Sequence, residues 1–524
     1  MTTYSRTTRL SAVGAALLAA AAGLAVSALG AALLGAPSPV VAVGNRAIDL
    51  APGPLKDYAV RTFGENDKPI LVGSVLVVLV LLAVVAGLVA LRRRTLALVI
   101  TGLIGVVALV AGFTDRSSQA SPVLAALPGL LALAVSVGSF AWMLAALAKR
   151  AGRSIPSPLA PHPGDDLRSD FDRRNFLVAA LATGAVAGVG GIGSRVFASN
   201  AAAASRADIS VPTPTSPAPA VPAGVQSPVA GVSPYLTSNA DFYRVDINLA
   251  VPNVPADTWR LRIHGLVDNE IELGFSDLLA MPLVERRITL TCVSNEVGGP
   301  YVGNATWIGV RIADLLAQAG VQQGADAVKS TSVDDFTIGT PIEALTDDRD
   351  AILAIAMNGE PLPLEHGFPV RMVVPGLYGF VSATKWVVDL EVTRFEDFTA
   401  YWTDRDWSAE APIKTHSRID VPGSFETVKA SSAAFGGVAW AQTTGIAKVQ
   451  VLIDDGDWQE AELAAEDSLV TWRQWSYRWT QATPGPHKVT IRATDKSGYT
   501  QTSGRVPPRP DGATGWQSVD FTVA

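Results

Sequence analysis

The chain carries one cysteine, Cys292, at a point where two kinds of local pattern meet. The strand-like run Thr289-Leu-Thr ends there, and a loop containing Gly298-Gly299-Pro300 follows. A single cysteine excludes intramolecular disulfides, thiolate-bound iron–sulfur clusters and cysteine-rich zinc sites. By default a lone cysteine is a small buried hydrophobe, whereas a cysteine that ends a strand beside a glycine-rich turn often faces a cavity. From the residues alone, Cys292 can be interpreted either as an inert thiol or as a functional thiolate.

A buried cation is predicted further along the chain. Arg371 lies inside the apolar run Pro369-Val-Arg-Met-Val-Val-Pro375, which reads as a buried strand bounded by prolines. An unpaired guanidinium in such a strand is costly, so a bound anion explains it best. His366 and Lys385 flank this strand. The alternatives are a turn-capping role for His366 and surface ion pairs for Lys385 and Arg244.

Several motifs, in one order, resemble those of the sulfite oxidase family of molybdopterin enzymes. The similar segments are Cys292-Val-Ser-Asn followed by Trp307-Ile-Gly-Val310, Met357-Asn-Gly-Glu-Pro-Leu-Pro363, and His366-Gly-Phe-Pro-Val-Arg371 continuing to Lys385-Trp386. The order and spacing of the resemblance cover nearly the whole of residues 235–524. Within these motifs, Trp307 and Met357 are interpreted as packing residues.

This resemblance implies a Mo-molybdopterin cofactor with Cys292 as the metal ligand, because a soft thiolate suits molybdenum held by the dithiolene of the pterin. It implies phosphate contacts from cationic groups, for which arginine is well shaped. The cofactor-binding residues that it implies are Asn239, Phe242, Tyr243, Arg244, Cys292, Ser332, Asp334, His366, Arg371, Ser382, Thr384 and Lys385.

The substrate pocket departs from the family pattern. The resemblance assigns substrate-orienting roles to Arg244 and Arg473 beside the metal ligand Cys292. Val297 stands where a further arginine is expected, and Trp407 stands at the position of the expected tyrosine. The pocket is therefore predicted to be less cationic and more apolar. A sulfite-like oxyanion is one candidate substrate, and an S-oxide or N-oxide reduced with electrons from membrane quinol is the alternative.

The hydropathy of the chain is concentrated before residue 200. The 524 residues are 48% hydrophobic and 17% charged, and their mean hydropathy is +0.28, which excludes an ordinary soluble enzyme and a disordered scaffold. Each apolar run is close to the roughly 20 residues that a membrane-spanning helix needs. Four strong runs and a weaker fifth are predicted as spans, at 13–34, 70–91, 95–113, 123–147 and 176–197.

Basic residues set the predicted topology. Arg6 and Arg9 precede the first run, Arg92–Arg94 join the second and third, and Lys149, Arg150 and Arg153 follow the fourth. The positive-inside rule then places the N-terminus and the 92–94 loop in the cytoplasm.

The fifth run follows Asp172-Arg173-Arg174-Asn175-Phe176-Leu177, which resembles the twin-arginine signal read by the Tat translocase. Ordinary arginines flanking a helix are the alternative. Export by this route is used mostly for domains that receive a complex cofactor before transport. We therefore expect a multi-pass protein of the cell membrane with its C-terminal region on the extracytoplasmic side. A retained anchor is expected, with 198–205 as the candidate cleavage stretch.

Four regions are predicted. Residues 1–200 form a helical membrane bundle with the twin-arginine motif at 173–174, and residues 201–235 form an extended Pro/Ala-rich linker. Residues 236–408 form an α+β molybdopterin domain, with a strand at 259–264 and a helix at 309–320. Residues 409–524, with strands at 447–453, 487–492 and 518–523, form an immunoglobulin-like β-sandwich that the resemblance identifies as a dimerisation domain.

Partners and exclusions complete the prediction. None of the five histidines lies in an apolar run, so no haem is expected in the bundle, and no cytochrome b5-like segment is present. Electrons must therefore pass to or from a separate partner, a cytochrome or the quinone pool. A net charge of −7 argues against nucleic-acid binding. The alternative of another class is a non-catalytic membrane receptor or adhesin.

Overall fold

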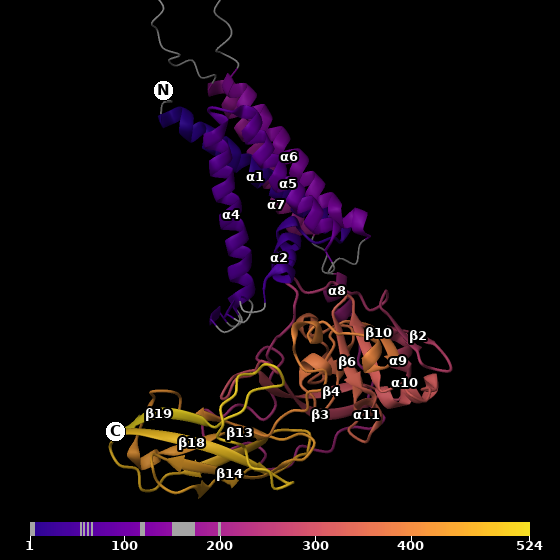
Figure 1. Cartoon of the computed structure of the whole chain (residues 1–524), viewed down its shortest axis with the longest axis vertical. Coiled ribbons are helices and arrows are strands. Elements are labelled where there is room, and N and C mark those ends of the chain that lie inside the picture. The colour runs from indigo at the N-terminus through magenta and orange to yellow at the C-terminus, as the bar shows by residue number, and fades with distance from the viewer. Residues whose placement is uncertain are drawn as a thin grey trace, which may run out of the picture. The chain divides into compact units, whose positions relative to one another are not determined.

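The computed structural model describes residues 6–52, 55, 58–59, 62–63, 66–115, 121–148, 173–197 and 201–524. The chain divides into two compact units (Figure 1). Unit 1 consists of Met1–Asn200 with Asn248–Ala250, and unit 2 consists of Ala201–Ile247 with Val251–Ala524.

Unit 1 is helical, as its apolar runs predict. Its described helices are α1 (Arg6–Leu34), α2 (Pro39–Leu50), α4 (Asp67–Ala90), α5 (Arg94–Phe113), α6 (Pro122–Ala148) and α7 (Arg173–Phe197). All of these except α2 are long and apolar enough to cross a membrane. The five predicted runs are therefore confirmed as helices, and they are compatible with membrane anchoring.

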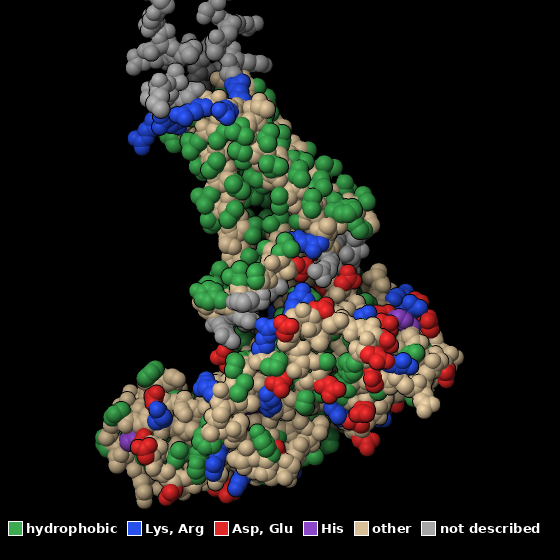
Figure 2. All heavy atoms as spheres, viewed as in Figure 1, with side chains coloured by type: hydrophobic (Ala, Val, Ile, Leu, Met, Phe, Trp, Pro, Cys, Tyr) green, Lys and Arg blue, Asp and Glu red, His purple; other side chains and the backbone are tan. Residues whose placement is uncertain are grey.

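The helices of unit 1 pack through small residues and turn large apolar ones outward. Ala15 and Ala19 of α1 are fully buried, and a Cβ on Gly87 of α4 would come within 2.7 Å of the Val13 backbone. Such close backbone approach is typical of helices in lipid. Val77 and Leu81 of α4 are exposed, and Figure 2 shows hydrophobic side chains gathered over this surface.

The twin-arginine motif falls at the start of α7, which begins at Arg173. Asp172 lies outside the described residues, as do Lys149, Arg150, Arg153 and His162.

The first half of unit 2 contains two five-stranded arrangements. One sheet has the order β2-β1-β10-β5-β6, in which β1 and β10 are parallel. In the other, β3-β4-β7-β8 are joined by β9, which pairs with β7. The strands are β1 (Arg260–Gly265), β2 (Ile271–Gly274), β3 (Val284–Thr291), β4 (Val302–Arg311), β5 (Ala327–Ser332), β6 (Thr337–Pro341), β7 (Ile352–Met357), β8 (Glu360–Pro361), β9 (Arg371–Val373) and β10 (Val387–Thr393).

Short helices cover these sheets: α8 (Ala201–Ala207), α9 (Phe275–Ala280), α10 (Ile312–Ala319) and α11 (Ile342–Thr346). The predicted helix at 309–320 is α10, which starts three residues later because β4 continues to Arg311. Leu315 and Leu316 face the core, as the spacing predicts. Gly320 ends the helix in the left-handed conformation that glycine favours.

Two further sheets form the second half of unit 2. Their orders are β11-β13-β17-β16 and β12-β19-β18-β14-β15. The strands are β11 (His416–Val421), β12 (Thr427–Val428), β13 (Ala434–Trp440), β14 (Ile446–Ile453), β15 (Gln459–Glu460), β16 (Glu462–Leu463), β17 (Arg473–Arg478), β18 (Gly485–Asp495) and β19 (Gln517–Val523). Three of them, β14, β18 and β19, are strands that alternation predicts. Phe435 and Trp475 from one sheet share a buried cluster with Ile491 and Phe521 from the other.

The segment predicted as an extended spacer, 201–235, is instead packed into unit 2. It begins with α8, and Ser216 then bridges Val284 of β3 in parallel. Thr215 N donates to Leu283 O at 2.8 Å, and Trp472 Nε1 donates to Tyr235 O at 3.0 Å. Proline lacks an amide donor but keeps the backbone extended. An extended backbone can lie along the edge of a strand, as this segment does beside β3.

Candidate active site

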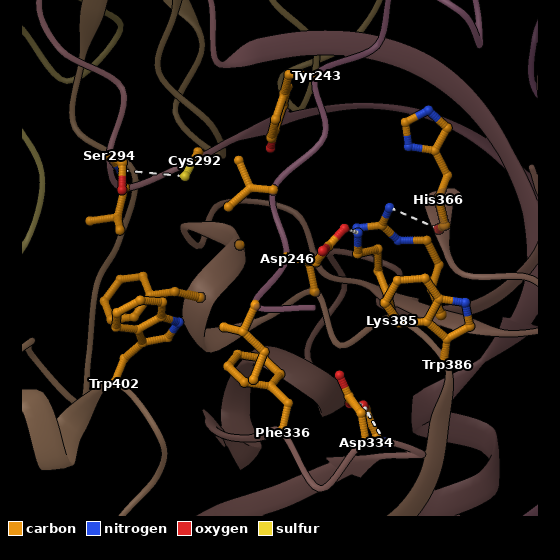
Figure 3. A pocket seen from close by; sticks show the side chains of 18 of the residues that line it. Tyr243, Asp246, Cys292, Ser294, Asp334, Phe336, His366, Lys385, Trp386 and Trp402 are labelled. Atoms are coloured by element: carbon orange, nitrogen blue, oxygen red, sulfur yellow. Dashed lines mark hydrogen bonds and ion pairs between the residues drawn. The ribbon is translucent and has the colours of Figure 1, made fainter. Parts of the chain in front are cut away.

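A cavity opens in unit 2 around Cys292 (Figure 3). About 940 Å³ of empty space lies within and in front of this cavity, open solvent at its mouth included. Its walls come from the segment before β1, the loops after β3 and β5, the stretch from His366 to the start of β10, and the loop after β10. The lining residues are Phe242, Tyr243, Val245, Asp246, Ile247, Cys292, Val293, Ser294, Ser332, Asp334, Phe336, His366, Arg371, Gly379, Phe380, Ala383, Lys385, Trp386, Trp402 and Trp407.

Cys292 immediately follows β3, as predicted, and its sulfur faces the cavity. Its backbone N donates to Tyr301 O at 3.0 Å, which fixes the turn after the strand. The Ser294 backbone N lies 3.4 Å from Sγ and donates to it. Burial raises the pKa of the thiol, so the free side chain stays protonated at neutral pH. Only an added positive charge, such as a metal ion, would favour the thiolate here.

Three basic side chains meet on another wall of the cavity. Arg371 is buried at the start of β9, His366 ends a short 3-10 turn, and Lys385 precedes β10. Gly367 permits this convergence: its φ is +109°, and a Cβ there would come within 3.0 Å of the Arg371 Cβ and 3.1 Å of the Lys385 Cβ.

Burial weakens the charged form of each of these groups. It lowers the pKa of Arg371 to about 10 and that of Lys385 to about 8, although the neighbouring carboxylate of Asp246 opposes the shift. Burial and the nearby Arg371 charge lower the pKa of His366 to about 4. His366 is therefore neutral at pH 7, and its Nε2 donates to the Asn239 carbonyl at 3.0 Å.

The burial and the partners of Arg371 show whether an anionic group fits this wall. It is 6% exposed, and it donates to the carbonyls of His366 at 3.2 Å and Met372 at 3.4 Å. In the described part of the chain no carboxylate pairs with it. A buried cation without a counter-ion is costly. A phosphate placed between Arg371 and Lys385 would supply the missing charge, so the residues fit a phosphorylated pterin.

Asp246 links the neighbouring cations and was missed by sequence reasoning. Its Oδ2 accepts from Arg244 Nε at 2.8 Å and from Lys385 Nζ at 2.7 Å. The signal was present in the sequence, because an acid flanked by Val245 and Ile247 alternates with apolar residues and follows a predicted arginine by two positions. Arg244 Nη2 remains buried without a hydrogen-bond partner.

Aromatic side chains form the remaining wall. Trp407 lies 6.0 Å from Trp402 and 5.7 Å from Phe380, measured between ring centroids. Phe336 lines the same cavity. Of these residues the sequence predicted only Trp407. The others come from separate loops that only the tertiary fold brings together.

The structure brings nine predicted residues to the cavity. They are Phe242, Tyr243, Cys292, Ser332, Asp334, His366, Arg371, Lys385 and Trp407. Phe242 packs edge-on against both His366 and Trp307, and Gly303 leaves room for its ring. Ser332 Oγ donates to Asp334, so these two residues form one polar group at the cavity floor.

Four predicted residues do not line the cavity but lie close to those that do. Asn239 donates to Glu360 at 2.7 Å and presents its carbonyl to His366. Arg244 reaches the site through Asp246. Ser382 donates to the carbonyls of Leu377 and Tyr378 at 3.1 and 3.0 Å, and Thr384 pairs with Ser330 at 2.6 Å. The two hydroxyls are satisfied by the protein itself, so they hold the loop rather than face a ligand.

Arg473 is not brought to the cavity, contrary to the prediction. It lies on β17, donates to Ala464 O at 2.9 Å and Ile446 O at 3.1 Å, and lies 3.6 Å from Glu466. These contacts tie strands of the second half of unit 2 together. Val297 is likewise not a lining residue. Among the described residues, no group of three or more His, Cys, Asp and Glu side chains is placed to hold a metal ion.

Comparisons with known proteins agree on one kind of domain. A family described as "Oxidoreductase molybdopterin binding domain" matches residues 248–402. Mitochondrial sulfite oxidase from Homo sapiens is 31% identical over 296 residues, 48% of this chain and 54% of that protein. The uncharacterized oxidoreductase YuiH of Bacillus subtilis (strain 168) is 37% identical over 144 residues, 28% of this chain and 69% of that protein.

The chain thus spans about half the length of the mitochondrial sulfite oxidases that it matches. Among solved structures, the sulfane dehydrogenase SoxCD from Paracoccus pantotrophus is similar with a TM-score of 0.48 and 22% identity, over 57% of this chain and 88% of that one.

Proposed function

Because the chain belongs to the sulfite oxidase family of molybdopterin-dependent oxidoreductases, we propose that it is a membrane-anchored, exported enzyme that transfers an oxygen atom to or from a small substrate. The observation that carries this proposal is the joint placement of Cys292 and the buried Arg371–Lys385 pair on one cavity. A soft ligand and an anion site in one pocket are what a phosphorylated metal cofactor requires.

Cys292 is proposed to be the protein ligand of the molybdenum. Arg371, Lys385 and neutral His366 are proposed to hold the phosphate end of the pterin, and Phe242 and Tyr243 to pack beside it. The bound group supplies two-electron oxygen-atom transfer. The chain itself positions this group, excludes water from the Arg371 side, and shapes the opening through which the substrate enters.

Arg244 and Trp407 have different proposed roles from those of the phosphate site. Arg244 is held by Asp246 through Nε, which leaves its buried Nη2 as a free donor. We propose that this donor contacts the pterin. Trp407 lines the cavity and is proposed to contact the substrate. Ser332 and Asp334, which pair with each other at the cavity floor, are proposed to offer hydrogen bonds to the pterin ring.

The anchor and the export route are part of the proposal. Five helices suited to spanning a membrane support the anchor. The arginine pattern of the loops supports a cytoplasmic N-terminus, and the motif at 173–174 supports export by the Tat translocase with the cofactor already inserted. The catalytic region would then lie outside the cytoplasm and exchange electrons with a cytochrome or the quinone pool.

The organisation of unit 2 is proposed to follow the predicted boundaries, with a molybdopterin domain at 236–408 and an immunoglobulin-like domain at 409–524. Two sheets that share one buried cluster support the second. A homodimer through this domain is proposed from the family resemblance.

Elemental analysis combined with a substrate panel tests the proposal. Detergent-solubilised protein from a molybdenum-sufficient host is expected to contain about one molybdenum and one pterin per chain. It should also turn over sulfite or a sulfoxide with an artificial electron carrier. Protein that retains neither metal nor pterin and turns over neither substrate would instead favour a membrane receptor or adhesin.

A specific observation favours the second candidate, a reductase of S-oxides or N-oxides fed by membrane quinol. Arg371 and Lys385 are the cations among the cavity's lining residues; Asp246 pairs with Lys385, and the cofactor phosphate is proposed to occupy Arg371. With a cofactor phosphate also bound, the cavity offers no surplus positive charge to a sulfite dianion. A higher kcat/KM for sulfite than for every neutral oxide in the panel would contradict this candidate.

Replacement of Arg473 gives a further expected result. Arg473→Ala removes hydrogen bonds to the backbone carbonyls of Ala464 and Ile446, so we expect a loss of about 1–2 kcal/mol in the free energy of unfolding. The KM for the enzyme's substrate should change less than twofold, because Arg473 does not line the cavity. Steady-state kinetics and thermal melting measure the two effects. A tenfold rise in KM with unchanged melting would restore Arg473 to the substrate site.

A further inference from the structure

The aromatic wall of the cavity consists of Trp402, Trp407, Phe380 and Phe336. We propose that it binds an aromatic or aliphatic group of an uncharged organic sulfoxide or N-oxide, and that it thereby sets the substrate class. This inference rests on the proposed oxygen-transfer function and narrows it.

The geometry of the wall suits an apolar ligand. The rings of Trp402 and Trp407 are inclined at 71°, and those of Phe380 and Trp407 at 59°. Each of these side chains is only half-buried, so part of each ring remains accessible. Rings inclined in this way leave edges and faces on which another apolar group gains contact.

The cations of the cavity lie away from the tryptophans of this wall. Figure 3 shows Trp402 on the side of Cys292 and Ser294, whereas His366, Lys385 and Trp386 lie on the opposite side. Lys385 is already paired with Asp246 at 2.7 Å, and the cofactor phosphate is proposed to occupy Arg371. An anion placed between the cysteine and the tryptophans would lose its water without gaining a cation, whereas a neutral oxide would not.

The loop that carries the two tryptophans is fixed by a segment of unit 2 that is distant in sequence. Arg509 Nη2 donates to the Arg405 carbonyl and to Asp406 Oδ2, both at 2.7 Å. Ser408 N donates to Pro510 O at 3.1 Å. A loop held on both sides of Asp406 keeps the two tryptophans in place before the ligand arrives, which lowers the entropic cost of binding. Arg509 is thus a positioning residue for Trp407.

In the proposed reaction the S–O bond of the sulfoxide breaks. Its oxygen takes two protons and leaves as water, and the sulfur is released as a thioether. Two electrons come from reduced methyl viologen in the assay and from the membrane carrier in the cell.

The test compares Trp402→Ala, Trp407→Ala and the milder Trp402→Leu with Trp458→Ala as control. Trp458 is a partly buried tryptophan that packs edge-on against Trp516 and does not line the cavity. The probes are methyl phenyl sulfoxide for turnover, methyl phenyl sulfone for binding without turnover, and sulfite as the anionic comparison.

We expect the two alanine variants to raise both the sulfoxide KM and the sulfone Kd at least ~10-fold, and Trp402→Leu to raise them by a smaller factor. The sulfite KM should change by a smaller factor than the sulfoxide KM, and the molybdenum content should stay within about twofold. The Trp458→Ala control should leave all four quantities unchanged. Arg509→Ala should raise the sulfoxide KM without lowering kcat, and Arg509→Lys should restore part of the loss. Trp402→Leu retains apolar bulk, so it keeps the test decisive if an alanine variant fails to fold.

Two outcomes overturn the inference while the proposed function stands: sulfoxide KM and sulfone Kd that do not respond to the cavity variants, or wild-type turnover of sulfite without measurable sulfone binding. Wild-type protein that lacks molybdenum and turns over neither substrate contradicts the proposed function itself.

Discussion

Cys292→Ser should lower turnover at least ~1000-fold, which corresponds to about 4 kcal/mol of activation free energy. The sulfur faces the cavity at the end of β3 and is proposed to be the protein's ligand to molybdenum. A serine hydroxyl is harder and far less acidic, so it does not replace a thiolate at such a metal. Steady-state kinetics on protein matched for molybdenum content measure the effect.

The fold should tolerate this change. The backbone bond from Cys292 to Tyr301 remains, and the substitution is nearly isosteric, so the melting temperature should move by only a few degrees. Pterin content should persist because Arg371 and Lys385 are unchanged. Cys292→Ala is the matched variant and should lose as much activity. Turnover within tenfold of the wild type in either variant, at equal molybdenum content, would remove Cys292 from the metal site.

Arg371→Met should have opposite effects on stability and on cofactor binding: it should stabilise the cofactor-free protein and weaken retention of the cofactor. In protein made without the pterin, Arg371 is a buried cation with no carboxylate partner, so methionine should raise the free energy of unfolding by about 1–3 kcal/mol. In protein made with the pterin, loss of a charge-assisted contact to phosphate should lower cofactor retention ~10- to 100-fold. Thermal melting of the cofactor-free protein and molybdenum analysis of the loaded protein measure the two effects.

Arg287→Met is the matched control for this prediction. Arg287 is also buried, but its Nη2 donates to Asp467 Oδ1 at 2.8 Å and its Nε donates to Oδ2. The same substitution there strands a buried carboxylate, so stability should fall by about 3–5 kcal/mol. If cofactor-free Arg371→Met melts below the wild type, as is expected for Arg287→Met, a protein group already neutralises Arg371.

The local sequence was sufficient to predict a site residue where one short segment contains both the strand and the reactive or charged side chain. Cys292 follows a strand at a glycine-rich turn, and Arg371 stands within a run too apolar for a free cation. The neighbours of Arg371 predicted a bound anion, whereas those of Cys292 left an inert thiol and a functional thiolate open until the family resemblance favoured the thiolate; both residues lie on the cavity. The five apolar helices were equally predictable, because their length and composition leave few alternatives.

Parts of the site that are assembled from distant loops were harder to predict from the sequence. Phe336, Phe380 and Trp402 come from three separate loops, and nothing in their neighbourhoods distinguishes them from core aromatics. Arg473 was assigned to the pocket by resemblance, yet it serves β17 and its neighbours, because a matching residue type does not fix the direction of a side chain. Ser382 and Thr384 have the right types and places for a ligand, but their hydroxyls bond within the protein.

Because residues 208–235 pack against the rest of unit 2, they determine where a truncated fragment without the apolar helices should begin. A fragment starting at 236 would discard Ser216, which adds to the edge of β3, and Ser227, whose N donates to Gln474 at 2.6 Å. It would also discard Tyr235, whose hydroxyl donates to Asp467. The exposed strand edge would then invite aggregation. The natural cut lies just before Ala201, where unit 2 begins.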